Sequence, residues 1–423
     1  MPLIARLVTE ARRAGGGLPR RFWWLWTSTL VNRLGGFVVT FLSMYLTAER
    51  HYPPAYVGLV GGLFGLGSAV SSLGAGVLTD RLGRRPTLLA AQLGTALSTA
   101  VLGFADGPVA IAAVAFLVGL TNNASRPAVS AMIADLVPPA DRVRAYALNY
   151  WAINIGFGVS AAVAGLLSAH GYLTLFLLDA LTTLLCAVVV FVKVPETRPG
   201  SKAADAPAGQ PRVGLGTVFR DGPFMAVVGV NLLLALVVLQ GSSTLPVDMA
   251  RHGLSPSVFG LVISLNGVLI VLLQLPLTRL MEGRDRTALL VAGALLTGWG
   301  FGLTALAGSS VALYALAVAV WTIGEIVNSP TMMALVAEHS PASARGRYQG
   351  VYSLSWSLAG FLAPVLGGLL LQYAGSWALW GGCAGAGTLA AVAFLRIGRR
   401  GPTPTEPTER VAAGAPAPAE VSA

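Results

Sequence analysis

The chain has 423 residues, of which 55% are hydrophobic and only 11% are charged, and its formal net charge is +10. A soluble domain carries about 25% charged residues, so this composition argues against an ordinary soluble enzyme or binding domain. The 28 lysines and arginines are spread over many short segments instead of forming one basic stripe, which argues against nucleic-acid binding.

Long apolar segments follow one another along the whole chain. A membrane-spanning helix needs about 20 apolar residues. Twelve segments meet that length, at about 22–47, 56–79, 87–105, 108–137, 143–169, 172–192, 223–249, 257–280, 287–307, 311–336, 346–373 and 377–397. We therefore predict an all-α membrane protein with twelve transmembrane helices.

The segments outside these spans suggest a division into two halves. We expect a basic N-terminal tail (1–21), a six-helix bundle (22–192), a linker (193–222), a second six-helix bundle (223–397) and a disordered C-terminal tail (398–423). The linker is rich in proline, glycine, alanine and charge, a composition typical of flexible connections.

The positive charges also predict the orientation in the membrane. Of the 28 lysines and arginines, 24 lie in the two tails, the linker and the alternate connections on the same side. The connections on the other side hold only Arg50 and Arg251. Lysine and arginine concentrate in cytoplasmic loops, so we expect a multi-pass cell-membrane protein with both termini in the cytoplasm.

A dense group of charge and glycine separates the second and third spans. It reads Gly76-Val77-Leu78-Thr79-Asp80-Arg81-Leu82-Gly83-Arg84-Arg85. The positive-inside tendency would account for its arginines but not for the glycines and the aspartate at these offsets. The stretch resembles the signature loop of the major facilitator superfamily, and every position of that motif is filled. The resemblance covers about 22–397 and implies two pseudo-symmetric six-helix bundles that transport solutes by alternating access.

The resemblance also implies that this loop is a cytoplasmic latch. Asp80 would lie at the N-terminus of the span that begins near Gly346, where the helix dipole favours a negative charge. The arginines would pair with acids such as Asp135 or Asp141. The gating residues implied in this way are Gly76, Asp80, Arg81, Gly83, Arg84 and Arg85.

An internal repeat supports two related halves. Pro127 and Pro330 lie 203 residues apart, and the same offset joins Asp135 to Glu338 and several other pairs. A constant offset across two spans and their connection indicates duplicated bundles, between which transporters of this kind place their substrate site.

Three ionisable residues interrupt the apolar spans. Charged groups are costly in the membrane, so Arg33, Arg126 and Glu325 are functional candidates. The resemblance implies that the first, fourth, seventh and tenth spans, three of which carry these residues, line a central cavity. Asp179, in a less central span, is expected to make a local hydrogen bond. The substrate cavity is predicted to include Arg33, Phe37, Asn122, Arg126, Asn328 and Met332.

Glu325 is the candidate proton carrier. Burial disfavours a carboxylate and a nearby arginine favours it, so a conformational cycle that changes either would load and release a proton. Two other interpretations remain open, a fixed ion pair with Arg33 or Arg126 that joins the bundles, and direct contact with substrate.

The sequence lacks a Walker loop, a zinc signature and a nucleophile elbow, so we expect neither an ATP-driven pump nor an enzyme, and no cofactor or metal. The expected partners are a small-molecule substrate, protons and the lipid bilayer, and the chain is expected to act as a monomer.

The predicted function is proton-coupled efflux, by antiport, of small amphipathic compounds or drugs, because the chain most resembles bacterial proton-coupled drug exporters. Those exporters carry a Gly-Pro motif in the fifth span, whereas here the proline is Pro364 in the eleventh span and Ala161 takes its place in the fifth. The alternative is a proton-coupled importer of a polar or anionic metabolite, with Arg126 as anion anchor. A non-transporting sensor is the third possibility.

Overall fold

The computed structural model describes residues 17–138, 141–197, 215–340 and 345–399. Within those residues, twelve helical segments are long and apolar enough to cross a membrane, as predicted. Most of the predicted N-terminal tail and nearly all of the C-terminal tail lie outside the described residues.

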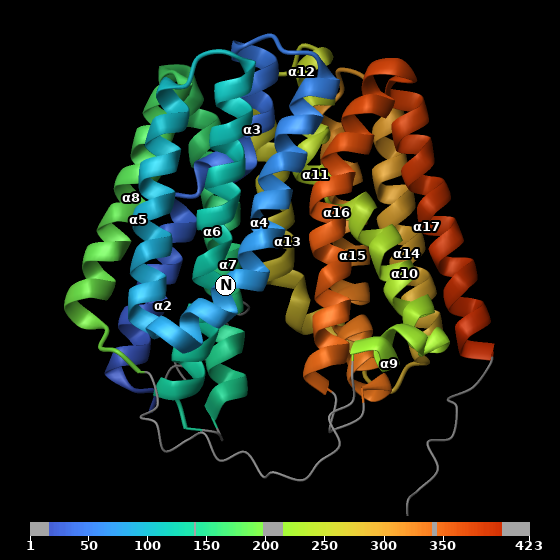
Figure 1. The fold of residues 1–423 in the computed structure, drawn as a ribbon. Coiled ribbons are helices and arrows are strands. Elements are labelled where there is room, and N and C mark those ends of the chain that lie inside the picture. The colour runs from blue at the N-terminus through green and yellow to red at the C-terminus, as the bar shows by residue number, and fades with distance from the viewer. Residues whose placement is uncertain (1–16, 139–140, 198–214, 341–344, 400–423) are drawn as a thin grey trace, which may run out of the picture.

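The helices form two bundles that lie side by side, blue to green and yellow to red in Figure 1. The N-terminal bundle contains α2 (Arg20–Leu34), α3 (Phe37–Met44), a π-helical turn (Tyr45–Glu49), α4 (Pro54–Leu82), α5 (Arg84–Phe104), α6 (Pro108–Leu136), α7 (Arg142–Leu167), a 3-10 turn (Ser168–His170) and α8 (Tyr172–Lys193). The C-terminal bundle contains α10 (Gly222–Val238), α11 (Gln240–Ser243), α12 (Leu245–Arg251), α13 (Pro256–Met281), α14 (Arg286–Leu303), a 3-10 turn (Thr304–Leu306), α15 (Val311–His339), α16 (Arg345–Tyr373) and α17 (Gly375–Arg399). A short helix in the linker, α9 (Leu215–Arg220), precedes the second bundle.

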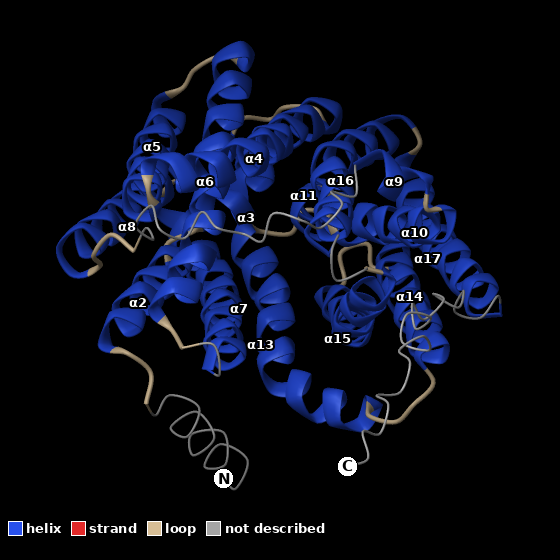
Figure 2. Ribbon diagram, turned by 60° about the horizontal axis from the view of Figure 1, so that its bottom comes forward, coloured by secondary structure: helices blue, strands red, loops and turns tan. Residues whose placement is uncertain are grey.

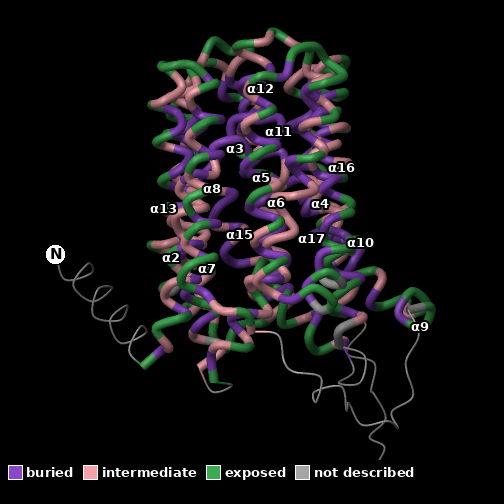
Figure 3. Tube along the Cα trace, turned by 60° about the vertical axis from the view of Figure 1, so that its left-hand side comes forward, coloured by how far each residue is buried: buried purple, intermediate pink, exposed green. Residues whose placement is uncertain are grey.

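The spans end at two opposite faces of the molecule. We call the end that carries α9 and the turn between α4 and α5 the linker face, at the bottom of Figure 1, and the end that carries α12 the distal face. Exposed residues cover the outside of the spans (Figure 3), and many of them are large and apolar, such as Leu97 and Phe191. Such an apolar outer surface suits contact with lipid.

The first and seventh spans, predicted as continuous helices, are both broken. The first breaks at Gly35 and Gly36, between α2 and α3. The seventh is divided at Leu239 and again at Thr244. Two adjacent glycines weaken a helix, which accounts for the first break. The first break lies midway along its span, and the second lies nearer the distal face.

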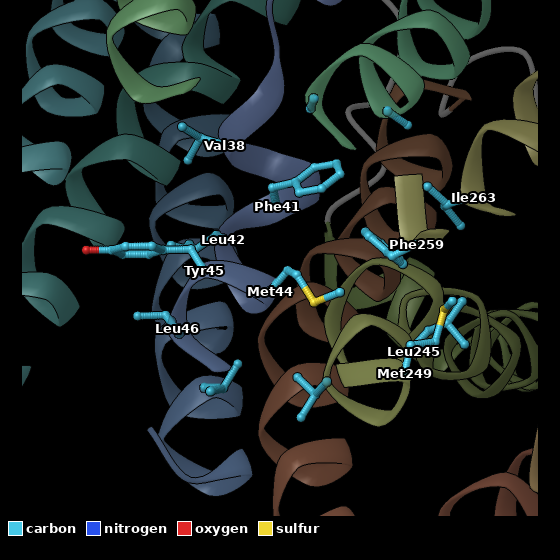
Figure 4. Close-up of a cluster of buried hydrophobic side chains, with 14 of the residues drawn as sticks. Val38, Phe41, Leu42, Met44, Tyr45, Leu46, Leu245, Met249, Phe259 and Ile263 are labelled. Carbon is cyan, nitrogen blue, oxygen red and sulfur yellow. The ribbon is translucent and has the colours of Figure 1, made fainter. Parts of the chain in front are cut away.

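The hydrophobic cores show where the two bundles join. One core, shared by both bundles, fills the distal half, and Figure 4 shows Phe41 and Met44 of α3 lying toward Phe259 of α13 and Met249 of α12. The rings of Phe41 and Phe259 meet edge to face, with 5.4 Å between their centroids. Two smaller cores lie nearer the linker face, each confined to one bundle.

Glycines allow this distal contact. Helix α4 packs on α16, and α7 packs on α13 (Figure 2). A Cβ added at Gly65 of α4 would lie 2.0 Å from the carbonyl oxygen of Gly360, and one added at Gly58 would lie 2.3 Å from that of Pro364. Nearer the linker face, a Cβ at Gly74 would meet nothing within 4 Å among the described residues. The two bundles are therefore closed together at the distal face.

Candidate functional site

A polar cavity lies inside the N-terminal bundle and has a volume of about 370 Å³. Four helices, α2, α5, α6 and α7, line it. The lining residues are Leu25, Ser28, Thr29, Asn32, Arg33, Leu88, Gln92, Ser125, Arg126, Val129, Ser130, Asn149, Tyr150 and Ile153. The lining thus combines two arginines, neutral polar side chains and a few apolar ones, and no acid belongs to it among the described residues.

A smaller cavity, of about 50 Å³, lies inside the C-terminal bundle. It is lined by Asn231, Leu234, Ala235, Val238, Thr297, Glu325, Asn328, Ser329, Met332, Tyr352 and Trp356, which belong to α10, α14, α15 and α16. These four helices are the counterparts of α2, α5, α6 and α7 in the internal repeat.

The two linings correspond at five positions of the repeat. Five pairs, each 203 residues apart, have one member in each cavity: Ser125 and Asn328, Arg126 and Ser329, Val129 and Met332, Asn149 and Tyr352, and Ile153 and Trp356. The duplicated bundles therefore carry equivalent cavities of opposite character, one with two cations and the other with one acid.

Glu325 is the central residue of the 29-residue helix α15 and is half-buried. The side-chain amide of Asn266, on α13, donates a hydrogen bond of 3.2 Å to its carboxylate and one of 3.0 Å to the hydroxyl of Thr322. Among the described residues no lysine, arginine or histidine lies within 4.0 Å of this carboxylate. The ion pair with Arg33 or Arg126 that the sequence left open is therefore not formed in this conformation.

The two arginines of the larger cavity come from different helices, Arg33 from α2 and Arg126 from α6. Within the described residues, neither guanidinium forms an ion pair, and the buried Nε of Arg33 has no hydrogen-bond partner. Two buried oxygens in the same lining, Oε1 of Gln92 and Oδ1 of Asn149, also lack partners. The cavity therefore has polar groups of Arg33, Gln92 and Asn149 that could form hydrogen bonds with a ligand.

The predicted cavity residues separate into three groups. Arg33 and Arg126 line the larger cavity, and Asn328 and Met332 line the smaller one with Glu325. Asn122 lines neither of these two cavities. Phe37 also lines neither cavity. It is the first residue of α3, beyond the break in the first span, and is buried in the shared distal core.

Asp179 of α8 explains how the break in the first span is stabilised. Its carboxylate accepts a hydrogen bond of 3.0 Å from the backbone N–H of Val38, in the first turn of α3, and one of 3.5 Å from Thr183. The hydrogen bond from Thr183, four residues on, is the expected local one, whereas the bond from Val38, 141 residues away, was not predicted. Gly35 is required beside it, because a Cβ there would lie 1.9 Å from the hydroxyl of Thr182.

Replacing Asp179 by leucine is expected to lower the free energy of unfolding by about 1–3 kcal/mol, because the buried N–H of Val38 loses its acceptor. Asp179→Asn keeps an oxygen at that place and is expected to lose much less. Thermal unfolding of the purified protein in detergent measures both. Equal melting temperatures for the leucine variant and the parent would contradict this role.

The turn between α4 and α5, in the signature loop, is held by an acid that the sequence analysis missed. Glu196, just after α8, accepts hydrogen bonds from the backbone N–H groups of Arg84 (2.9 Å) and Arg85 (3.1 Å), at the start of α5. Gly83 has φ of +109°, and a Cβ there would lie 2.6 Å from the Glu196 carboxylate. Both facts require glycine at this position.

The linker face also carries equivalent ion pairs in the two bundles. Arg84 pairs with Asp135 at 3.1 Å, and Arg286 pairs with Glu338. The members correspond at offsets of 202 and 203 residues. Arg81 is exposed, whereas the side chain of Asp80 and the surroundings of Gly76 lie outside what the structure describes.

Comparisons with known proteins agree on one family. The family model described as Major Facilitator Superfamily matches residues 25–325 and 241–421. Among curated proteins, the chain is similar to the uncharacterized MFS-type transporter YhjO of Bacillus subtilis (strain 168), 25% identical over 83% of this chain and 85% of that protein. It is also similar to the multidrug resistance protein MdtH of Cronobacter sakazakii (strain ATCC BAA-894), 26% identical over 86% of this chain and 88% of that protein.

Solved structures with the same fold include more distant proteins. A mutant of the nucleoside transporter NupG superposes with a TM-score of 0.76 at 14% identity, covering 89% of this chain and 100% of that one. A mutant of the peptide transporter POT bound to sulfate also gives 0.76, at 17% identity, covering 91% and 96%. At these identities the likeness concerns the fold alone.

Proposed function

Because the chain belongs to the Major Facilitator Superfamily, we propose that it exports small amphipathic compounds across the cell membrane in exchange for protons. The observation that carries the coupling is the setting of Glu325, which lies at the middle of its span beside neutral partners. An acid in such a place can take up and release a proton when its access to water changes. The similarity to MdtH proteins supports drug-like substrates.

Alternating access between the two bundles would expose the cavities to one side of the membrane at a time. The joined distal halves and the separate cores near the linker face support a conformation that opens toward the linker face. The concentration of arginine at that face supports its assignment to the cytoplasm. Closure there would engage the latch formed by Gly76, Asp80, Arg81, Gly83, Arg84 and Arg85.

Inside-out membrane vesicles test the direction and the coupling together. With the vesicle interior made acid, adding an exported substrate outside should release protons, which a pH-sensitive dye such as acridine orange reports. The screen should include cationic, neutral and anionic amphipathic compounds, with vesicles from cells that lack the protein as the control. Export predicts proton release for at least one class. Substrate movement without proton movement would contradict coupling, and the absence of any response would favour a sensor.

A further inference from the structure

The cavity of the N-terminal bundle has a charge imbalance that its own residues do not correct. Its lining contains Arg33 and Arg126 but no acid from the part of the chain that the structure describes. The two arginines come from different helices, α2 and α6, and line the same cavity. A site that holds two like charges together without a counter-charge is suited to an anion from outside the chain.

Asp179 of α8 is a buried acid that does not belong to this lining, and its carboxylate already has partners. Among the described residues it forms no ion pair with Arg33 within 4.0 Å. Its two oxygens are engaged by the backbone N–H of Val38 and the hydroxyl of Thr183. It is therefore held in place as the cap of α3, and the Nε of Arg33 has no hydrogen-bond partner within the described ranges.

Neutral groups in the same lining add to the binding capacity. Gln92 is only 6% exposed, and its Oε1 has no partner, as is also true of Oδ1 of Asn149. A primary amide carries donors as well as an acceptor, so each can turn either toward a bound group. Buried polar atoms are normally hydrogen-bonded, so these two oxygens, which have no partner among the described residues, mark the amides as available to a bound group.

The rest of the lining limits the kind of ligand. Leu25, Leu88, Val129 and Ile153 supply apolar surface, and about 370 Å³ lies within the range of small-molecule sites. Tyr150 adds a phenol hydroxyl to the same lining.

We propose that Arg33 and Arg126, with Gln92 and Asn149, bind the oxyanion group, a carboxylate or a phosphate, of an amphipathic anion. Its apolar part lies against the leucine, valine and isoleucine side chains of the same cavity. This proposal rests on the proposed function, because it identifies the class of compound transported. It does not depend on the direction of transport.

Three probes with one naphthalene scaffold test it by isothermal titration calorimetry on the purified full chain in detergent. 1-Naphthoate and 1-naphthyl phosphate carry the two oxyanions, and 1-naphthamide is the neutral match. At least one anion is expected to bind about tenfold or more tightly than the amide. The preferred anion identifies whether the site is built for carboxylate or phosphate.

Variants connect the binding to the two arginines. Arg33→Gln and Arg126→Gln are each expected to weaken binding of the preferred anion about tenfold or more, and Arg126→Lys less, since it keeps the charge. Arg396→Gln, an exposed arginine of α17 outside the cavity, is the matched control and should bind as the parent does. Equal binding of anion and amide, unchanged affinity in both glutamine variants, or no saturable binding of either anion would overturn the proposal.

These measurements are made without a gradient and therefore separate this proposal from the proposed function. Anion binding without proton exchange in vesicles would leave the oxyanion site standing and remove the coupling. Proton exchange driven only by cationic or neutral compounds would support the coupling and remove the oxyanion site.

Discussion

Glu325→Gln is expected to abolish uphill transport driven by a proton gradient, reducing it to the level of liposomes without protein. Glutamine keeps the size of the side chain and can still pair with Asn266, but it cannot take up or release a proton. Substrate exchange without a gradient needs no net proton movement and should persist in this variant. Parallel uptake and counterflow assays in proteoliposomes separate the two activities.

Glu282→Gln is the matched control for this prediction. It removes the same charge from an exposed turn between α13 and α14, away from both cavities. Its transport should equal that of the parent. Full proton-driven uptake by the Glu325 variant would refute the proposed role of this acid, and loss of both uptake and counterflow would assign it to substrate contact or to the structure of the site.

Gly65→Ala is expected to block the cycle by preventing the distal halves from closing. The added Cβ would lie 2.0 Å from the carbonyl oxygen of Gly360 and 2.4 Å from its carbon, and backbone atoms cannot turn aside. Overpacking of this kind costs about 1–3 kcal/mol, which shifts a two-state equilibrium by roughly 5- to 150-fold. Transport should fall accordingly.

Gly74→Ala, on the same helix, provides the control. A Cβ there meets nothing within 4 Å among the described residues, and alanine favours a helix more than glycine does. A cysteine placed at Ser130, in the wall of the larger cavity, reports how often that cavity is open to thiol reagents. Its labelling should decrease with Gly65→Ala and remain unchanged with Gly74→Ala, and equal labelling in the two variants would contradict the close-approach argument.

The sequence contained most of the architecture because lipid imposes a simple rule on span length. Twelve apolar segments, the filled signature motif and the 203-residue offset were enough to predict the helices and the two bundles. Mid-span charge likewise identified Arg33, Arg126 and Glu325, and the structure places all three in cavity linings.

Long-range capping could not be predicted in this way. That Asp179 caps α3 depends on how α8 packs beside the break, which no local pattern records. The adjacent Gly35 and Gly36 were a local signal for the break, but the apolar periodicity on either side masked it. Gln92 and Asn149 were not predicted as cavity residues. The free-energy cost of a neutral amide in a membrane span is lower than that of a charge, so an amide is a weaker signal of function.

The equivalent cavities suggest how one duplicated bundle acquired two tasks. The same positions of the repeat hold Arg126 on one side and Ser329 on the other, and Asn122 corresponds to Glu325. Differences at a few corresponding positions thus distinguish a candidate anion site in one bundle from a candidate proton site in the other. The surrounding helices retain the same packing roles, as the two corresponding ion pairs at the linker face show.

Distances measured across both faces by pulsed electron paramagnetic resonance test the alternating movement most directly. Exposed positions Leu82 and Gln349 report the linker face, and Val109 and Tyr373 report the distal face, while the native cysteines Cys186 and Cys383 are buried. On addition of a transported compound or a change of pH, the two distances are expected to change in opposite senses. Distances that stay fixed, or that lengthen and shorten together, would contradict the account.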